Sequence, residues 1–407
     1  MTSDGPSGVV IVGGGLAGFT TATALRDGGF AEPITIVESE PASYDRPPLS
    51  KSAFAAGLGI EAIAFADVER FRQLAIDTRF GRTAVSIDPD AGTVVLDDGT
   101  VLSAARIVLA TGGVPRRPAC EPSGTRLVSV LRTFADAQRI RALATPGSRA
   151  IVAGGGLVGA ELTAQLRALG VGVTLVDRNE VPMIPAFGET LARHLHAMHA
   201  AHGVDVRIAA LEAIEERGDV VVATLSDGSV VQADQLVAGL GITAASRLAE
   251  AAGLRVEDGI VVDREHRTSH PRVFAAGDAA RFDGPGGLER REEHWEAAEL
   301  AGRETAAAIL GQPPLTRGAR WFWSDRYGVH VEVVGRLVGG GAEIVRETGE
   351  HPTVFRVDGG LLVGAASVDD PMTVKAARRI IDQAIPVTPE QLADPSISLR
   401  SLLRPSR

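Results

Sequence analysis

Two short glycine motifs are the residues best placed to do chemistry in this chain of 407 residues. In the first motif, Gly13, Gly15 and Gly18 follow the apolar run GVVIV, and Glu38 stands 20 residues after the last glycine. In the spacing Gly-x-Gly-x-x-Gly, the glycines allow a tight turn, the approach of a pyrophosphate and close packing of a helix on a strand. An acid at the end of the next strand accepts hydrogen bonds from ribose hydroxyls. The motif therefore predicts a dinucleotide site.

A second motif repeats this logic at Gly154, Gly156 and Gly159, with Asp177 a further 18 residues on. An acid at this position favours NADH over NADPH, because it repels a 2′-phosphate. Arg178 comes directly after it and is able to attract that phosphate, so the strictness of the preference stays open. Two such sites in one chain suggest one bound flavin dinucleotide and one exchanging nicotinamide dinucleotide.

Each motif needs strands and a helix to position it, and the sequence supplies them twice. Residues 8–38 and 149–177 both read as strand, glycine turn, helix and strand. Each unit is followed by a hairpin, the first turning at residues 97–99 and the second at 227–228, and then by a buried strand. This repetition predicts two nucleotide-binding domains of the same type.

The last part of the chain has a different pattern. A helix is predicted over 295–311, and the prolines at 313–314 mark a linker. Alternating strands begin near residue 320, and a helix follows near 372–383. The predicted fold class is α/β, with two Rossmann-like dinucleotide-binding domains and a C-terminal α+β domain. We expect the first domain at 1–113 and 239–318, the second at 114–238 and the third at 319–407.

Composition excludes several classes of protein. The net charge of −10 argues against general nucleic-acid binding. No apolar run is long enough to span a bilayer and the first residues do not form a signal peptide, so we expect a cytoplasmic protein that does not bind membranes. The one cysteine, Cys120, excludes an internal disulfide, a CxxC redox centre and a cysteine-based metal site.

Histidines cluster on one predicted helix, at positions 194, 196, 199 and 202. Since no acids accompany them at clear ligand spacing, we expect a solvated helix face and no metal site.

Further motifs carry a resemblance to a known family. The segments IVLATGG at 107–113 and T-x6-A-x-G-D from Thr268 to Asp278 resemble the two-dinucleotide-binding flavoprotein reductases, whose fold is glutathione-reductase-like. The segments RPPLSK at 46–51, HWEAAELAGRETAAAILG at 294–311 and WFWSDRYG at 321–328 are similar to one branch, the ferredoxin–NAD(+) reductases of bacterial cytochrome P450 and ring-hydroxylating dioxygenase systems. The similarity runs essentially end to end.

The resemblance implies a reaction and its residues. NADH would give a hydride to FAD, which would pass single electrons to a [2Fe–2S] ferredoxin. Lys51 would lie near flavin N5 and pair with Glu161, and these two are the expected catalytic residues. FAD would be bound tightly and non-covalently by Gly13, Gly15, Ala17, Gly18, Glu38, Arg46, Lys51, Ala84, Thr111, Gly112, Arg132, Asp278, His294 and Trp295. NADH would be bound by Gly154, Gly156, Leu157, Val158, Gly159, Glu161, Asp177 and Gly241.

Cysteine usage narrows the reaction independently. The stretch PASYDRPPLSKSAF after the first strand–helix–strand unit contains no cysteine, so electrons must leave the flavin directly for an outside acceptor. Alternatives remain open at this point: a rubredoxin or quinone reductase, an NADH oxidase, or a binding flavoprotein that responds to NADH. Reoxidation by a [2Fe–2S] protein, by O2 alone, or a long-lived charge-transfer complex would tell these apart.

The expected partner is an acidic ferredoxin, which a local basic patch on this acidic chain would orient. The candidate arginines are Arg290, Arg291, Arg303, Arg317 and Arg320. We expect a monomer or a weak dimer.

Overall fold

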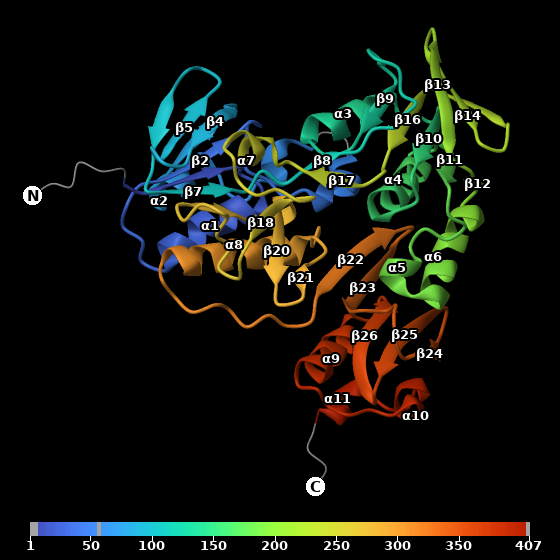
Figure 1. Ribbon diagram of the computed structural model, residues 1–407. Coiled ribbons are helices and arrows are strands. Elements are labelled where there is room, and N and C mark those ends of the chain that lie inside the picture. The colour runs from blue at the N-terminus through green and yellow to red at the C-terminus, as the bar shows by residue number, and fades with distance from the viewer. Residues whose placement is uncertain (1–6, 55–57, 404–407) are drawn as a thin grey trace, which may run out of the picture. The chain divides into compact units, whose positions relative to one another are not determined.

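The computed structural model describes residues 7–54 and 58–403 and divides the chain into two compact units (Figure 1). Unit 1 contains Met1–Pro48, Ala56–Val114 and Ile242–Thr316. Unit 2 contains Leu49–Ala55, Pro115–Gly241 and Arg317–Arg407. Each unit is built from segments that are far apart in the sequence.

Unit 1 is organised around a five-stranded parallel sheet in the order β19-β7-β1-β2-β3. Its strands are β1 (Val9–Val12), β2 (Ile34–Glu38), β3 (Ile76–Phe80), β7 (Arg106–Leu109) and β19 (Val273–Ala275). Buried apolar runs such as VVIV form the central strands, as expected for a parallel sheet covered on both faces. Helices α1 (Leu16–Asp27) and α8 (Trp295–Ile309) lie side by side (Figure 1).

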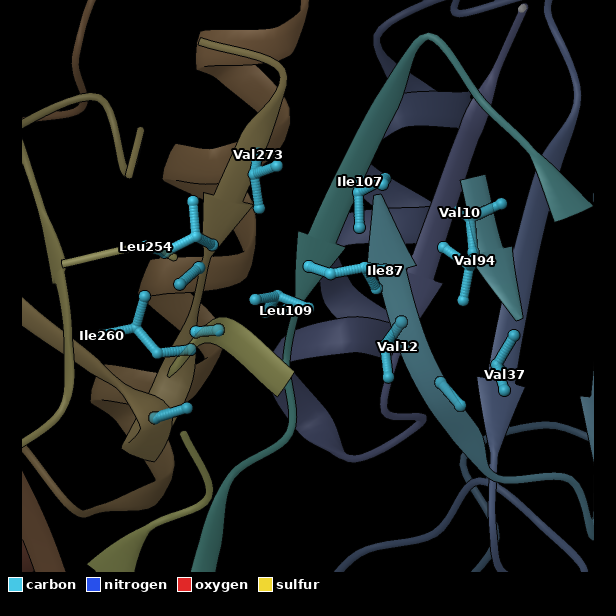
Figure 2. Close-up of a cluster of buried hydrophobic side chains, with 14 of the residues drawn as sticks. Val10, Val12, Val37, Ile87, Val94, Ile107, Leu109, Leu254, Ile260 and Val273 are labelled. Carbon is cyan, nitrogen blue, oxygen red and sulfur yellow. The ribbon is translucent and has the colours of Figure 1, made fainter. Parts of the chain in front are cut away.

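One hydrophobic core of this unit lies between the parallel sheet and a small antiparallel sheet. Figure 2 shows Val10, Val12 and Leu109 of the parallel strands facing Ile87 and Val94. The antiparallel sheet consists of β4 (Ala84–Asp88), β5 (Thr93–Leu96) and β6 (Val101–Ser103). The remaining α-helices and strands of this unit are α2 (Val68–Gln73), β8 (Gly113–Pro115), β17 (Ile242–Ala244), α7 (Arg247–Ala251), β18 (Ile260–Val262), β20 (Ala280–Gly284) and β21 (Gly287–Leu288).

Unit 2 repeats this plan in a five-stranded parallel sheet of order β12-β11-β10-β16-β9. Its strands are β9 (Val128–Val130), β10 (Arg149–Ala153), β11 (Gly172–Asp177), β12 (Asp205–Ile208) and β16 (Gln235–Ala238). The antiparallel sheet is β13 (Leu211–Arg217), β14 (Val220–Leu225) and β15 (Val230–Ala233), and the helices are α3 (Phe134–Leu143), α4 (Leu157–Ala168), α5 (Ile184–Phe187) and α6 (Glu189–Ala201).

The C-terminal part of unit 2 is a five-stranded antiparallel sheet of order β22-β23-β26-β25-β24. Its elements are β22 (Trp321–Arg326), β23 (Val329–Gly335), β24 (Ala342–Thr348), β25 (His351–Asp358), β26 (Leu361–Val368), α9 (Pro371–Asp382), α10 (Pro389–Ala393) and α11 (Leu399–Leu402). Helix α9 packs its apolar side chains, Val374 and Ile380 among them, against this sheet.

The predicted fold class is confirmed: both Rossmann-like sheets and the C-terminal α+β domain are present. The three predicted domain ranges remain a prediction, and they include residues 1–6, 55–57 and 404–407, which lie outside the described residues. Among the described residues, 49–54, 239–241 and 317–318 were predicted to belong to the first domain but lie in unit 2, whereas Val114 lies in unit 1. No helix within the described residues is both long and apolar enough to cross a membrane.

Candidate functional site

The first glycine loop has the shape of an anion cradle. Gly13 has φ +108°, and a Cβ there would lie 2.2 Å from the carbonyl oxygen of Ala110. A Cβ on Gly18 would lie 1.9 Å from the carbonyl oxygen of Gly13, so glycine lets α1 pack close to the turn. Gly15 differs, because its φ is −64° and a Cβ would meet nothing within 4 Å. Since neither backbone nor packing requires glycine there, close approach of a ligand to the N-terminus of α1 explains it.

Glu38 is held rigidly at the end of β2, beside this loop. Its Oε2 accepts a hydrogen bond from the Gly14 amide at 2.7 Å. Its Oε1 accepts hydrogen bonds from the Ser39 hydroxyl and the Glu40 amide. The side chain is buried, and these bonds keep an acceptor next to the open cradle, where a ribose is expected.

The second glycine loop has the same geometry in unit 2. Gly154 has φ +102°, and a Cβ there would lie 2.4 Å from the carbonyl oxygen of Gly239. A Cβ on Gly159 would lie 1.9 Å from the carbonyl oxygen of Gly154, whereas Gly156 again faces open space. Leu157 and Val158 form the first turn of α4 directly behind this opening.

Asp177 ends β11 as Glu38 ends β2. Its Oδ2 accepts from the Gly155 amide at 2.8 Å, and its Oδ1 accepts from the amide and the side chain of Asn179. Gly241 has φ +82° and nothing near its missing Cβ. Both halves of the chain thus present an open helix N-terminus and a fixed carboxylate, an arrangement that suits two dinucleotides.

Several predicted FAD residues meet where α1 and α8 begin. A Cβ on Gly277, next to Asp278, would lie 2.9 Å from the Ala17 side chain. Trp295 is the first residue of α8, and its Nε1 donates a hydrogen bond to Asp45 at 2.9 Å. His294 caps the same helix by accepting from a backbone amide. Small residues therefore bring two helix N-termini and the Asp278 turn together, and these termini favour negative charge.

The other predicted FAD residues of unit 1 have local partners. Arg46 forms an ion pair with Glu40 at 3.3 Å. Thr111 donates to the carbonyl oxygen of Ala245 at 2.7 Å, and Gly112 follows with φ +68°. Ala84 is the first residue of β4 and its side chain is buried, so only its backbone is available to a ligand.

The predicted catalytic pair lies within unit 2. The ammonium of Lys51 lies 3.1 Å from Oε2 of Glu161 and 3.4 Å from Oδ2 of Asp325. Glu161, only 4% exposed, also accepts hydrogen bonds from the hydroxyls of Ser50 and Ser324, at 2.6 and 2.8 Å. A buried carboxylate with these donors is fixed in place, and it fixes the lysine in turn.

Sequence reasoning missed Ser50, Ser324 and Asp325 as partners of this pair. RPPLSK and WFWSDRYG contain all three, so the signal was present, but only the folded chain brings the two segments to α4. Arg132, also in unit 2, stands just before α3, and its backbone amide donates to Asp136.

The expected solvated histidine face is wrong for His199. This side chain is 1% exposed, and its Nδ1 lies 2.6 Å from the hydroxyl of Tyr327. Burial, with the charge of Arg326 as the next cause, lowers the pKa of His199 to about 3. His194 pairs with His351 instead, at 2.7 Å. Tyr327 of the β22–β23 loop and His351 of β25 contact this helix face, which the helical pattern alone did not reveal.

The predicted docking arginines differ in accessibility. The side chain of Arg291 is 4% exposed; it donates to the carbonyl oxygen of Asp278 and pairs with Glu293 at 2.8 Å. A buried, paired guanidinium is not available to a partner, so we leave Arg291 out of the docking surface. Arg303 is 59% exposed and pairs with Glu299 one turn away. Arg290, Arg317 and Arg320 are exposed.

Two family models match consecutive parts of the chain. Residues 7–302 match the family model described as pyridine nucleotide-disulphide oxidoreductase, and residues 321–403 match the model described as reductase C-terminal.

Relatives match along nearly the whole chain. The ferredoxin–NAD(+) reductase component of a p-cumate 2,3-dioxygenase system of Pseudomonas putida is 36% identical, over 97% of this chain and 98% of its own. Rhodocoxin reductase of Rhodococcus erythropolis is 34% identical, over 96% and 93%. The reductase in a crystal structure of a covalent putidaredoxin reductase–putidaredoxin complex superposes with a TM-score of 0.92 at 31% identity, covering 98% of this chain and 99% of that one.

Proposed function

Because the chain belongs to the pyridine nucleotide-disulphide oxidoreductases, among the ferredoxin–NAD(+) reductases, we propose that it passes electrons from NADH through FAD to a [2Fe–2S] ferredoxin. The ferredoxin in turn serves a cytochrome P450 or a ring-hydroxylating dioxygenase. The observation that carries this proposal is the pair of equivalent open glycine cradles, each beside a fixed acid, in one chain.

FAD fits the first cradle and NADH the second. The bound FAD supplies the chemistry of taking a hydride and giving up single electrons. Glu38 and the N-terminus of α1 would hold the ribose and pyrophosphate of FAD. Asp177 and the N-terminus of α4 would do the same for NADH, and no cysteine in the segment that contains Lys51 competes for the electrons.

Lys51 and Glu161 have distinct tasks in this proposal. Glu161 holds the ammonium group in one orientation, with the two serine hydroxyls holding the carboxylate. Lys51 presents a fixed positive charge, which stabilises negative charge that develops at a neighbouring redox centre. The rings of Trp321 and Trp323 are stacked on each other, and the ammonium of Lys51 lies 5.7 Å from the centre of the Trp323 ring.

Anaerobic rapid mixing tests the function directly. The purified protein should be yellow, and denaturation should release FAD and leave the chain colourless. NADH should bleach the flavin faster than NADPH does, and an oxidised [2Fe–2S] ferredoxin should restore its absorbance. Release of FMN, colour that stays on the chain, or reoxidation by O2 but not by ferredoxin would contradict the proposal.

A further inference from the structure

A continuous set of charged side chains leads from the catalytic pair to the surface of unit 2. Oδ2 of Asp325 contacts Lys51 at 3.4 Å, and Oδ1 of the same carboxylate lies 2.6 Å from Nδ1 of His330. Nε2 of His330 lies 3.3 Å from Oε1 of Glu332. Side-chain exposure rises from 6% at Glu161 to 19% at Lys51, 33% at Asp325 and 40% at His330. Glu332 is again nearly buried, with a side chain 9% exposed, so His330 is the member of the set most open to water.

The β22–β23 hairpin places these groups opposite one another. Its two-residue loop, Tyr327-Gly328, has positive φ at both positions, as a tight hairpin turn with right-handed twist requires. This turn sets the register in which Asp325 pairs with His330 and Trp323 pairs with Glu332. Directly paired residues share a face of the sheet, so the contact between Asp325 and His330 follows from the register itself.

Acids surround His330 from each strand that the structure places against it. Asp325 comes from β22 and Glu332 from β23, and Asp369, after β26, accepts from the His330 amide at 2.8 Å. Burial lowers the pKa of His330, but the hydrogen bonds and charges of Asp325 and Glu332 outweigh it and raise the pKa above its ordinary value. Imidazole is the side chain whose ordinary pKa lies closest to neutral pH, so its chemistry suits the uptake and release of a proton.

The proposed reaction must dispose of one proton, and the inference rests on that function. NADH gives up a hydride, which carries two electrons and one proton. Two ferredoxins take one electron each and no proton. The balanced reaction is therefore NADH plus two oxidised ferredoxins to NAD(+), one proton and two reduced ferredoxins, and the proton must reach solvent.

We propose that Asp325 and His330 form the outlet that carries this proton from Lys51 to solvent. Lys51 passes a proton to Oδ2 of Asp325, and the carboxyl group turns and passes this proton to Nδ1 of a neutral His330 ring. Nε2 of the resulting imidazolium then releases a proton to water. Lys51 regains its proton from the one that the hydride leaves behind. Each transfer crosses a contact present in the structure, and no side chain changes its oxidation state.

Rapid mixing of the holoenzyme separates this role from a structural one. Hydride transfer releases no proton, so His330→Gln should bleach with NADH at the wild-type rate. Reoxidation by ferredoxin should slow at least about tenfold, since a positioned proton carrier contributes that much or more. Imidazole added to His330→Gln should restore the rate. The matched control is His351→Gln, which removes a hydrogen-bonded histidine of β25 in the same unit and should change neither step.

A titration provides a readout that does not depend on turnover. NMR of the full chain should follow the His330 ring, whose pKa should fall in Asp325→Asn because the neutral amide removes an attracting charge. In Lys51→Met the pKa of His330 should rise, because Asp325 loses the cation that neutralises it. No change in Lys51→Met would show that the contacts are not coupled, and would overturn the inference.

Failure of the proposed function and failure of the proton outlet give different results. If wild type is not bleached by NADH or not reoxidised by ferredoxin, the proposed function is wrong. If wild type does both, and His330→Gln either slows bleaching and reoxidation equally or is not rescued by imidazole, the function stands. In that case Asp325 and His330 only hold Lys51 in place, and the outlet is refuted.

Discussion

Asp177 is the residue on which the expected preference for NADH over NADPH depends. It is fixed by three hydrogen-bond donors and lies beside the open N-terminus of α4. We expect Asp177→Asn to lower the ratio of kcat/KM for NADH over NADPH by about tenfold to a hundredfold, because hydrogen bonds to a charged group contribute about 1.5–3 kcal/mol. The amide also stops repelling a 2′-phosphate. Steady-state kinetics with both cofactors measures the ratio.

The matched control for this change is Asp205→Asn. Asp205 is an exposed acid on the neighbouring strand β12, where it pairs with Arg207. The control should leave the cofactor preference unchanged. An unchanged preference in Asp177→Asn itself would remove this residue from the recognition of NADH.

The burial of His199 should make the stability of the folded chain depend on pH. Because burial lowers its pKa to about 3, the folded chain keeps this ring neutral while the unfolded chain protonates it below about 6.5. Stability from this residue is therefore present above pH 6.5 and is lost as the pH falls from 6.5 toward 3. Between pH 7 and pH 5, wild type should lose about 2 kcal/mol more unfolding free energy than His199→Gln does. Denaturant unfolding at both pH values measures the difference.

His202→Gln serves as the comparison for His199, since it is an exposed histidine on the same helix end that also contacts Tyr327. Between pH 7 and pH 5 it should still lose more unfolding free energy than His199→Gln does. If His199→Gln follows wild type, the buried ring is protonated in the folded state, and burial does not keep it neutral.

Residue types and spacing predicted the two cradles because each is a local feature, complete within about 30 residues. The surroundings of Glu161 could not be predicted in the same way. Lys51 and Ser324 reach it from segments more than 100 residues distant on either side, and a resemblance to a family suggested only the lysine. The burial of His199 escaped for the same reason: its covering partner, Tyr327, is 128 residues away.

At the scale of elements, the pairing of α1 with α8 depends on one glycine. A Cβ on Gly302 would lie 2.6 Å from the carbonyl oxygen of Ala17 and 2.8 Å from Cβ of Thr20. Gly302→Ala should therefore cost about 1–3 kcal/mol through overpacking, although alanine is the better helix former. The shift of α1 should also weaken FAD retention. Thermal unfolding and the FAD content after gel filtration measure the two effects.

Arg303→Ala is the control one position along the same helix, where the side chain is exposed and pairs with Glu299. It should leave the melting temperature and the FAD content close to those of wild type. Equal losses in both variants would mean that α8 tolerates neither change, and that the glycine contact is not the cause.

Repeats predicted most elements, but not all. Hairpin turns at 97–99 and 227–228 identified two strands in each antiparallel sheet, whereas the structure has three, with β4 and β13 added. These strands alternate exposed and buried residues only weakly, and β13 carries four charged residues in LEAIEER. Their pairing is decided by the neighbouring strands, which a local pattern does not record.

At the scale of the whole molecule, the two parallel sheets have the same layout but recruit their last strand differently. In unit 2 the outer strand β9 precedes the glycine motif, whereas in unit 1 the outer strand β19 comes after the whole of the second nucleotide-binding region. Unit 1 is therefore discontinuous in sequence. Its core closes only after residue 273 has been added, so we expect truncation before that residue to prevent unit 1 from folding.

Limited proteolysis with mass spectrometry checks this expectation. A chain that ends at residue 241 should lack protection throughout 58–113, although unit 2 strands of the same fragment have their own sheet partners. Full protection of 58–113 in that fragment would show that the sheet of unit 1 is stable without β19.

The net charge of the chain affects how it meets the ferredoxin. A net charge of −10 repels an acidic partner at long range, so productive encounter needs local positive charge. Arg303 is exposed on α8, the helix whose N-terminus meets the predicted FAD residues of unit 1.

Arg303→Glu should slow ferredoxin reduction at low salt while NADH bleaching and ferricyanide reduction keep their rates. Arg264→Glu makes the same charge change on an exposed loop and should have the smaller effect. Because salt screens charges beyond about 8 Å, the difference between the two variants should shrink as ionic strength rises. A loss of ferricyanide reduction in Arg303→Glu would mean that this arginine supports the flavin site, and that ferredoxin binds elsewhere.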